Sequence, residues 1–345
     1  MEYDREGPQL PTARGPLAAA VGAHLLGTGP LPGPEAVAAA PVYGDDLQLA
    51  LYQCYELHYR GFAGVSPGLE WDPELLRTRA ALEDRFLSAL RADTRVHESV
   101  EDAVGALLVE PVHGEGVSHF LRDEGELWQL REYAAQRSLY HLKEADPHAW
   151  VLPRLWGRAK AAMAAVEFDE YGGGRAERVH ARLFADLMAD LGLDTTYGSH
   201  LDAASAECLA TVNMMSLFGL HRALRGALVG HFAAVEITSS PGSRRLAEAM
   251  RRTGAGPAAE HFYDEHVEAD AVHEQIVRHE VIDGLLEQEP WLAADVAFGI
   301  DATGHLEDRF GARLLADWRA GRSSLRVPLP VAPALRADSE ISHIS

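Results

Sequence analysis

The hydrophobic and polar positions of this chain repeat with the period of an α-helix over most of its length. Apolar residues recur three and four positions apart, and the alternating runs typical of strands are nearly absent. The pattern therefore predicts an all-α fold, a bundle of long helices in a single domain. Helices are expected at residues 12–26, 45–60, 72–92, 98–110, 124–145, 147–168, 174–191, 203–237, 243–253, 256–287, 290–302 and 303–320.

Local signals suggest where some of these helices begin and where the chain divides. Asp72-Pro73 and Asp146-Pro147 each place an Asp at the N-cap and a Pro at the first helical position. A Pro/Gly-rich connector covers residues 27–34, and the segment from residue 326 is rich in Pro and Ser. We therefore expect an N-terminal extension (1–44), a helical domain (45–325) and a flexible tail (326–345).

Composition and charge narrow the class of protein. Hydrophobic residues make up 47% of the 345 positions, enough for a sizeable core, and the net charge of −21 argues against nucleic acid or an anionic membrane as a partner. Cys54 and Cys208 form no CxxC pair, and residues 1–16 lack the basic and apolar regions of a secretory signal. No apolar run is long enough to span a membrane, so we expect a soluble, cytoplasmic protein.

The strongest chemical signal lies between residues 261 and 273. On a helix, His266, Asp270 and His273 are four and then three residues apart, so they fall within roughly 60° of one another around the axis. Two imidazoles and a carboxylate on one stripe suit a transition metal with mixed nitrogen and oxygen ligands, such as non-haem iron. The alternative is a solvated polar face, because Glu265 and Glu274 are also polar.

A site for two metal ions needs further acids or histidines from facing helices, and Glu236 is a clear candidate. It ends the mainly apolar run 230–235, and a lone buried carboxylate is costly unless it is paired or bound to a metal. The alternative places Glu236 at a helix end, facing water beside Thr238.

Glu170 and His180 form a second candidate pair. Gly172–Gly174 lies between them and can supply the bend that lets the two side chains converge. Taken alone, His180 is typical of an ordinary surface or core histidine. Glu167 and Asp169 are equally close carboxylates, so spacing does not select Glu170 among them.

The order of these residues resembles the ligand set of haem-oxygenase-like di-iron oxidases and oxygenases. In that family three core helices supply Glu and His, then Glu, then His, Asp and His, and no haem is bound despite the name of the fold. The resemblance covers roughly residues 130–320 and implies a haem-oxygenase-like helical bundle, here with an N-terminal helical extension. The most similar branch contains the N-oxygenating enzymes of azomycin and streptozotocin biosynthesis. That branch adds a carboxylate on an earlier helix, and Glu144 stands at that position; a solvated surface acid is the alternative.

The resemblance implies two irons per chain, cycling between Fe(II) and Fe(III). Glu170, His180 and His266 would bind the first iron, with Glu144 as an added ligand. Glu236, Asp270 and His273 would bind the second, and at least one carboxylate would bridge. The implied reaction is O2-dependent oxygenation of an amine in a small natural-product precursor, through a peroxo-di-iron(III) species, to a hydroxylamine, nitroso or nitro group. An external reductant or reductase would supply electrons, since the chain carries no flavin or nicotinamide motif.

Other functions stay open at this point. A di-iron oxidase of the same fold could desaturate, decarboxylate or cleave an amino acid or a fatty-acid-like substrate, and a non-catalytic iron-binding protein is a third possibility. Haem degradation is the least expected, because a lone proximal histidine would suffice for it. Arg222 and Arg225 either contact a substrate carboxylate or pair with surface acids. The sequence is compatible with a homodimer.

Overall fold

The computed structural model describes residues 7–109 and 114–329, and within them the chain is helical and contains no β-strand, which confirms the predicted all-α fold. The α-helices are α1 (Pro16–Leu25), α2 (Pro34–Ala39), α3 (Asp45–Glu56), α4 (Pro73–Asp93), α5 (Val100–Leu107), α6 (Val117–Asp123), α7 (Leu127–His141), α8 (Asp146–Ala149), α9 (Gly157–Glu170), α10 (His180–Asp190), α11 (Ala206–Leu220), α12 (Arg225–Thr253), α13 (Pro257–Ile276), α14 (Asp283–Gln288) and α15 (Ala293–Arg319). The 3₁₀ turns are η1 (Pro67–Trp71), η2 (Leu152–Arg154), η3 (Gly172–Gly174), η4 (Ala176–Arg178), η5 (Leu201–Ala203), η6 (Arg222–Leu224) and η8 (Pro290–Leu292), and η7 (Val277–Ile282) is π-helical.

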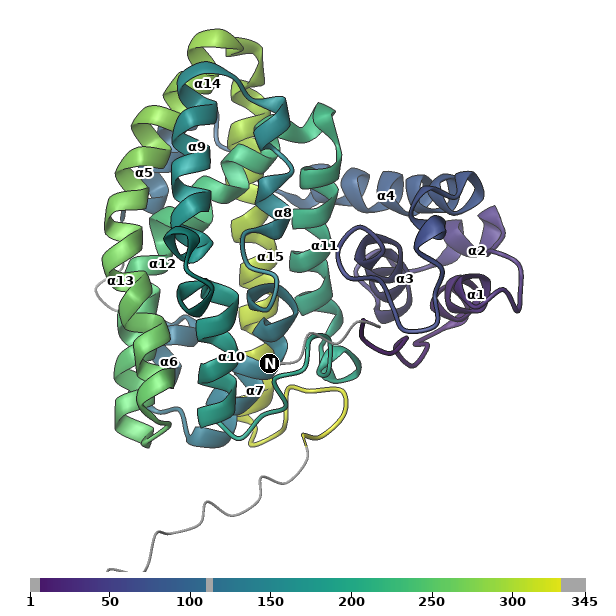
Figure 1. The fold of residues 1–345 in the computed structure, drawn as a ribbon, viewed down its shortest axis with the longest axis horizontal. Helices are drawn as coiled ribbons and strands as arrows, with labels where there is room; N and C mark the ends of the chain where they lie inside the picture. Colours follow the sequence, from purple (N-terminus) through teal and green to yellow (C-terminus); the bar gives the residue numbers. More distant parts are fainter. Residues whose placement is uncertain (1–6, 110–113, 330–345) are drawn as a thin grey trace, which may run out of the picture.

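Helix α12 lies at the centre of the bundle. It packs against α13 and α15, while α10 covers α13 and α11 lies against α15 (Figure 1). The close approach of α12 and α15 requires glycine: a Cβ at Gly230 or Gly299 would collide with a backbone carbonyl of the opposite helix. The long helices therefore run side by side at short distance, and side chains on α12 face several of its neighbours at once.

The N-terminal helices form a separate layer on one side of the bundle. Helices α1 to α4 lie beyond α11, and α3 packs directly against α11 (Figure 1). The buried Lys143 ammonium, on the turn after α7, lies 3.0 Å from a carboxylate oxygen of Glu56 on α3. The division at residue 44 stays a prediction. Of the predicted tail, residues 330–345 lie outside the described part, while the Arg326 amide donates to the Ala203 carbonyl.

The two capping predictions have different outcomes. Asp72 is confirmed as the N-cap of α4, because its carboxylate accepts the backbone N–H groups of Glu74 and Leu75. The prediction for Asp146 is wrong. Ala145 is the N-cap of the four-residue α8, and Asp146 is already its first helical residue, with a side chain that accepts the Tyr171 hydroxyl.

Several helix boundaries also differ from those expected. The helix predicted over 203–237 is interrupted at residues 221–224, where His221 adopts an extended conformation. The predicted end at 237 is wrong, because α12 continues through Pro241 to Thr253. Packing along α12 offsets the cost of the proline, which removes one backbone hydrogen bond. The two helices expected at 290–302 and 303–320 are largely one, α15, and α6 has no counterpart among the predictions.

None of the helices within the described ranges has the combination of length and apolar character that crossing a bilayer requires.

Candidate metal centre

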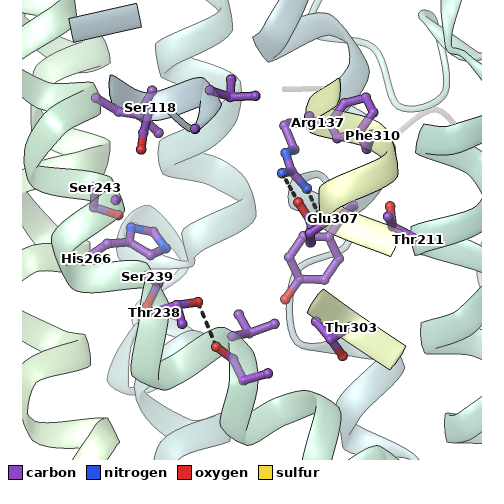
Figure 2. A pocket seen from close by; sticks show the side chains of 18 of the residues that line it. Ser118, Arg137, Thr211, Thr238, Ser239, Ser243, His266, Thr303, Glu307 and Phe310 are labelled. Carbon is purple, nitrogen blue, oxygen red and sulfur yellow. Dashed lines mark hydrogen bonds and ion pairs between the residues drawn. The ribbon is translucent and has the colours of Figure 1, made fainter. Parts of the chain in front are cut away.

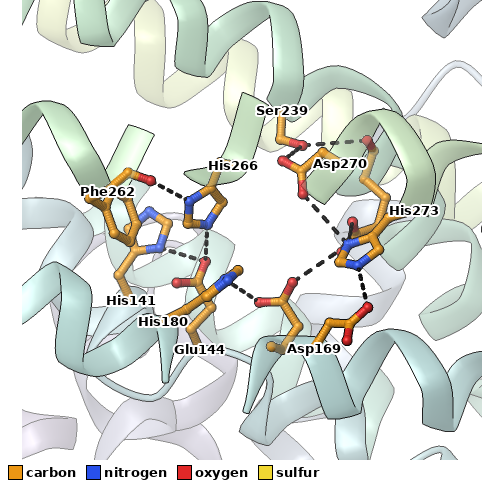
Figure 3. A network of polar contacts seen from close by, with 11 residues as sticks. His141, Glu144, Asp169, His180, Ser239, Phe262, His266, Asp270 and His273 are labelled. Carbon is orange, nitrogen blue, oxygen red and sulfur yellow. Dashed lines mark hydrogen bonds and ion pairs between the residues drawn. The ribbon is translucent and has the colours of Figure 1, made fainter. Parts of the chain in front are cut away.

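The seven candidate metal ligands are all buried, and the fold gathers them into two adjacent groups (Figure 3). We call the first the histidine-rich cluster and the second the carboxylate-rich cluster. Within each cluster the residues offer nitrogen or oxygen atoms that all lie within 4.8 Å of one another. The histidine-rich cluster comprises Glu144, His180 and His266, and the carboxylate-rich cluster comprises Glu170, Glu236, Asp270 and His273. Their assignment as metal ligands stays a prediction.

The helical stripe expected on α13 is present, and it points inward. His266, Asp270 and His273 are each at most 7% exposed, so the alternative of a solvated polar face is wrong for these three side chains. Glu236 lies in the middle of α12 rather than at a helix end and is 5% exposed. Because α12 packs along α13, the Glu236 carboxylate comes within 3.1 Å of the Nδ1 atom of His273.

The glycine segment brings Glu170 and His180 together. Glu170 is the last residue of α9, and His180 is the first residue of α10. Gly172, Gly173 and Gly174 all have positive φ angles, of 71°, 62° and 79°. A Cβ at Gly172 would also collide with the Arg178 backbone, so this sharp reversal depends on glycine.

Glu170 occupies the boundary between the two clusters. Its Oε2 atom lies 2.7 Å from Nδ1 of His180, and its Oε1 atom lies 3.7 Å from Nδ1 of His273. The sequence placed Glu170 with His180 and His266, whereas the geometry groups it with Glu236, Asp270 and His273. With one oxygen facing each cluster, Glu170 is the carboxylate best placed to bridge two cations.

Glu144 is held on a strained turn. It follows α7, and the next residue, Ala145, is the non-glycine residue with a positive φ in the described part of the chain, at 73°. The Glu144 carboxylate lies 2.7 Å from Nδ1 of His141 and 3.7 Å from Nε2 of His266. A strained backbone persists only where the surrounding structure imposes it, and here it directs Glu144 toward His266 rather than toward solvent.

Hydrogen bonds fix the orientation of two histidine rings. Nδ1 of His266 lies 2.7 Å from the Phe262 carbonyl, which can only accept, so this nitrogen carries the proton and leaves Nε2 toward Glu144. His273 is turned the other way: Nδ1 faces the carboxylates, and Nε2 lies 3.4 Å from the Asp169 carboxylate. Such outer partners fix the tautomer of histidines that bind metals.

The charges of these groups are strongly coupled. Although burial lowers the pKa of a histidine, the Glu144 carboxylate raises that of His266 to about 10, and Asp270 with Glu236 raises that of His273 to about 11. Burial raises the pKa of Glu236 to about 8. Protons thus balance a dense group of carboxylates, which is the role that metal cations perform in such sites.

The donor set fits two cations. Two buried atoms of the histidine-rich cluster have no hydrogen-bond partner, namely Nε2 of His266 and Oε2 of Glu144, while Nδ1 of His180 faces Oε2 of Glu170. Unpaired buried groups are costly, and a cation bound between these two atoms would satisfy both. Mixed imidazole and carboxylate donors suit iron.

Asp169 and Glu167, the two other acids close to Glu170 in the sequence, lie outside both clusters. Asp169 is 60% exposed in its side chain and contacts His273 from outside the clusters. Glu167 is 2% exposed, and neither carboxylate oxygen has a partner. Burial and the nearby Glu170 and Glu236 raise the pKa of Glu167 to about 9, so it is protonated at neutral pH.

A cavity of about 790 Å³ lies beside both clusters. Five of the candidate ligands line it, together with side chains from α7, α11, α12 and α15. Two helical glycines enlarge it: a Cβ at Gly242 on α12 or at Gly304 on α15 would meet no atom within 4 Å. A second cavity of about 410 Å³ reaches His180 and His273 from the side of the glycine segment.

The sequence missed the polar groups on the far side of the large cavity. Arg137 on α7 and Glu307 on α15 form an ion pair in its wall (Figure 2). Nothing in their spacing distinguishes them from surface charges. Arg222 and Arg225, which the sequence suggested for a substrate carboxylate, do not line this cavity, and Arg225 pairs with Glu289.

The comparison with known families agrees with this geometry. Residues 131–308, more than half of the chain, match a family described as iron-containing redox enzymes. The chain belongs to this family. The match covers most of the helices that carry the two clusters and supports a haem-oxygenase-like fold and an iron-dependent oxidoreductase. A search of curated proteins finds no match.

Proposed function

We propose that this iron-containing redox enzyme is a non-haem di-iron oxygenase that uses O2 and an external reductant to oxidise an amine of a small natural-product precursor. The product would be a hydroxylamine, nitroso or nitro compound. The observation that carries the proposal is the pair of adjacent clusters, joined by Glu170 and open to a cavity of about 790 Å³.

The residues of each cluster would divide the work of holding two irons. His180, His266 and Glu144 would hold the first, while Glu236, Asp270 and His273 would hold the second. Glu170, which lies between the two clusters, would help to hold both. When bound, two such irons supply the electrons and the coordination positions that activate O2.

The surrounding residues orient and protect this site. The Phe262 carbonyl presents Nε2 of His266, and the Ser239 hydroxyl donates to Asp270 at 2.5 Å, which restrains its carboxylate. Burial raises the pKa of Glu167 to about 9, so this side chain adds no further negative charge to the neighbouring carboxylates at neutral pH. Apolar side chains such as Met214 and Phe232 line the cavity and limit the water near the reacting nitrogen.

The metal assignment is tested by iron content. Protein loaded anaerobically with Fe(II) should hold about two irons per chain, as a two-metal site of this type requires. His273→Ala should lose the iron of the carboxylate-rich cluster first. His261→Ala, at an exposed position on the same helix, is the matched control and should keep both. Two irons in a variant lacking both Asp270 and His273 would refute the assignment.

The type of reaction is tested through Glu144 and through the product. Glu144→Ala should keep the fold and most of the iron but reduce oxygenation of the amine. Mass spectrometry separates the outcomes: gain of oxygen on nitrogen supports the proposal, whereas loss of two hydrogens or of carbon dioxide supports a di-iron oxidase of carbon. Iron binding without O2 consumption, across a panel of amines, would support a non-catalytic iron protein.

A further inference from the structure

The ion pair in the cavity wall is held in a fixed orientation. Nη1 of Arg137 lies 2.9 Å from Oε1 of Glu307, and Nη2 lies 2.5 Å from Oε2, so the contact is bidentate. Nε of Arg137 donates to the Tyr133 hydroxyl at 3.2 Å. The guanidinium also lies over the Phe310 ring, 4.9 Å from its centroid. These contacts leave the pair little freedom to turn.

This pair differs from a sealed structural ion pair. The side chains of Arg225 and Glu289 are 7% and 4% exposed, whereas those of Arg137 and Glu307 are 18% and 36% exposed and line the cavity. An ion pair inside a helical bundle is often no more stabilising than apolar side chains of the same volume. An open pair beside a candidate metal centre therefore suggests a role in binding.

The pair keeps unused hydrogen-bonding capacity. After the contacts to Glu307 and Tyr133, each Nη atom of Arg137 retains one N–H. Each oxygen of Glu307 retains a lone pair, and the Arg137 guanidinium lowers the pKa of Glu307 although burial opposes this. The wall therefore presents donors and acceptors next to one another, with opposite charges.

The charge pattern favours one type of ligand. A simple carboxylate near Arg137 would also be repelled by Glu307, and a simple amine near Glu307 would be repelled by Arg137. A ligand with adjacent positive and negative groups places each next to its opposite. Fatty-acid-like monoanions and simple monoamines gain less from the same wall.

The position of the ion pair in the cavity constrains the shape of the rest of the ligand. Figure 2 shows Arg137 and Glu307 on one side of the cavity and His266 with Ser239 on the other. A ligand held by the pair must extend across the cavity to approach the clusters. Apolar side chains, including Met214 and Phe232, line the space and suit a chain of methylene groups.

We propose that the Arg137–Glu307 pair binds the zwitterionic head of an α-amino acid, with its carboxylate at Arg137 and its ammonium at Glu307. The side chain of the amino acid extends toward the two clusters and ends in the nitrogen that is oxidised. This inference rests on the proposed function, since it identifies the class of amine that the enzyme would take.

The test measures binding without turnover. Full-length protein loaded with Fe(II) is titrated anaerobically, by calorimetry, with L-ornithine, L-lysine and L-arginine. Each is compared with its decarboxylated counterpart (putrescine, cadaverine, agmatine) and with the analogue that lacks the α-amino group. At least one amino acid should bind about tenfold or more tightly than both analogues, as expected for two charge-assisted hydrogen-bonded contacts.

Two variants assign each half of the head group. Glu307→Gln should abolish the preference over the analogue without the α-amino group, and Arg137→Gln should abolish the preference over the decarboxylated analogue. The double variant avoids leaving one charge unpaired, and circular dichroism with iron content verifies its fold. As a control, Asp295→Asn removes an ion pair with Arg91 of α4. Asp295 lies on α15, the helix that carries Glu307, and its substitution should change neither preference.

The outcomes separate this inference from the proposed function. If no amino acid binds more tightly than its analogues, or if both preferences survive the two variants, the zwitterion site is refuted. Selective binding without an oxidised product after O2 and reductant are added would keep the site and refute the oxygenation. If the enzyme oxidises an amine that binds equally well to wild type and to both variants, the oxygenation stands and the zwitterion site is refuted.

Discussion

Lys143 and Glu144 are adjacent in the sequence and both are buried, but their side chains face opposite surroundings. The Lys143 ammonium lies 3.0 Å from Glu56 and 4.0 Å from the centre of the Tyr59 ring, and Glu56 also accepts the Tyr197 hydroxyl. Glu144 points the other way, into a group of acids and histidines with unpaired atoms. A buried charge with complete partners supports the fold, whereas incomplete partners gathered in one place indicate a binding site.

The largest expected effect tests the structural half of this comparison. Lys143→Met leaves the buried Glu56 carboxylate without its cationic partner, so the free energy of unfolding should fall by about 3–5 kcal/mol. Urea denaturation of the metal-free protein measures it. The exposed Lys160→Met is the matched control and should be nearly neutral. Stability should partly return in Glu56→Gln/Lys143→Met, and its failure to do so would argue against a simple ion pair.

The second prediction concerns pH and tests the other half. Glu236 and Glu167 have raised pKa values of about 8 and 9, against 4.5 for an ordinary Glu, so they hold protons more strongly in the folded chain. Their contribution to stability is full below pH 4.5 and is lost as pH rises through 8 and 9. The pKa values of His266 and His273 are also raised, to about 10 and 11. Their contributions to the stability of the folded chain are therefore full below pH 6.5 and are lost as pH rises toward those values.

Metal-free protein should therefore lose stability from pH 5 to pH 9, on the order of a few kcal/mol. Iron should reverse the trend, because metal binding displaces protons. Denaturation curves at several pH values, with and without Fe(II), measure this dependence. Glu236→Gln should flatten the metal-free curve, and Glu248→Gln, an exposed position on the same helix, should not. A metal-free stability that rises with pH would contradict the coupled cluster.

A third, smaller effect distinguishes the two clusters from each other. Asp169 contacts His273, while the partner of His266 is a backbone carbonyl that substitution cannot remove. Asp169→Ala should weaken binding of one iron about 10–100-fold and leave the other unchanged. Competition with a chelator measures both affinities. Glu177→Ala, an exposed acid in the same connection, serves as control; equal weakening of both irons would show that the clusters do not act separately.

The smallest effect concerns the turn that separates Lys143 from α8. Ala145→Gly relieves a positive φ and should raise the free energy of unfolding by about 1 kcal/mol or less, after the entropic cost of glycine. Binding of the iron near Glu144 should weaken at the same time, because the turn becomes looser. Ala164→Gly, exposed within α9, should instead cost about 1 kcal/mol. Destabilisation by Ala145→Gly would mean that the turn is not strained.

The sequence indicated the helical class and the residues that gather in the two clusters for a physical reason. Helical periodicity reports buried faces directly, and His266, Asp270 and His273 share one stripe whatever the helix packs against. The grouping of Glu170 was not predictable in this way, because it depends on how three glycines reverse the chain. Glu144 came only from a resemblance, since its direction is set by the backbone of Ala145.

Other features depend on contacts between distant segments. Pro241 normally ends a helix, and only the packing around α12 shows that it does not do so here. Arg137 and Glu307 are separated by 170 positions, and their pairing exists only after α7 and α15 are packed. The continuation of α12 and the Arg137–Glu307 pair both depend on packing between distant segments, which a local sequence pattern does not encode.

Substitution of Gly242 and Gly304 offers a way to reduce the volume of the large cavity in small steps. Both lie within helices, where glycine is less favourable than alanine by about 1 kcal/mol, so an added side chain would gain helix stability rather than lose it. Both also face open space, so an added methyl group fits without collision. Descendants of this chain could therefore narrow the cavity from two opposite helices in single mutational steps. Single substitutions at these two glycines can thus reshape the cavity without a stability barrier and without touching the two clusters.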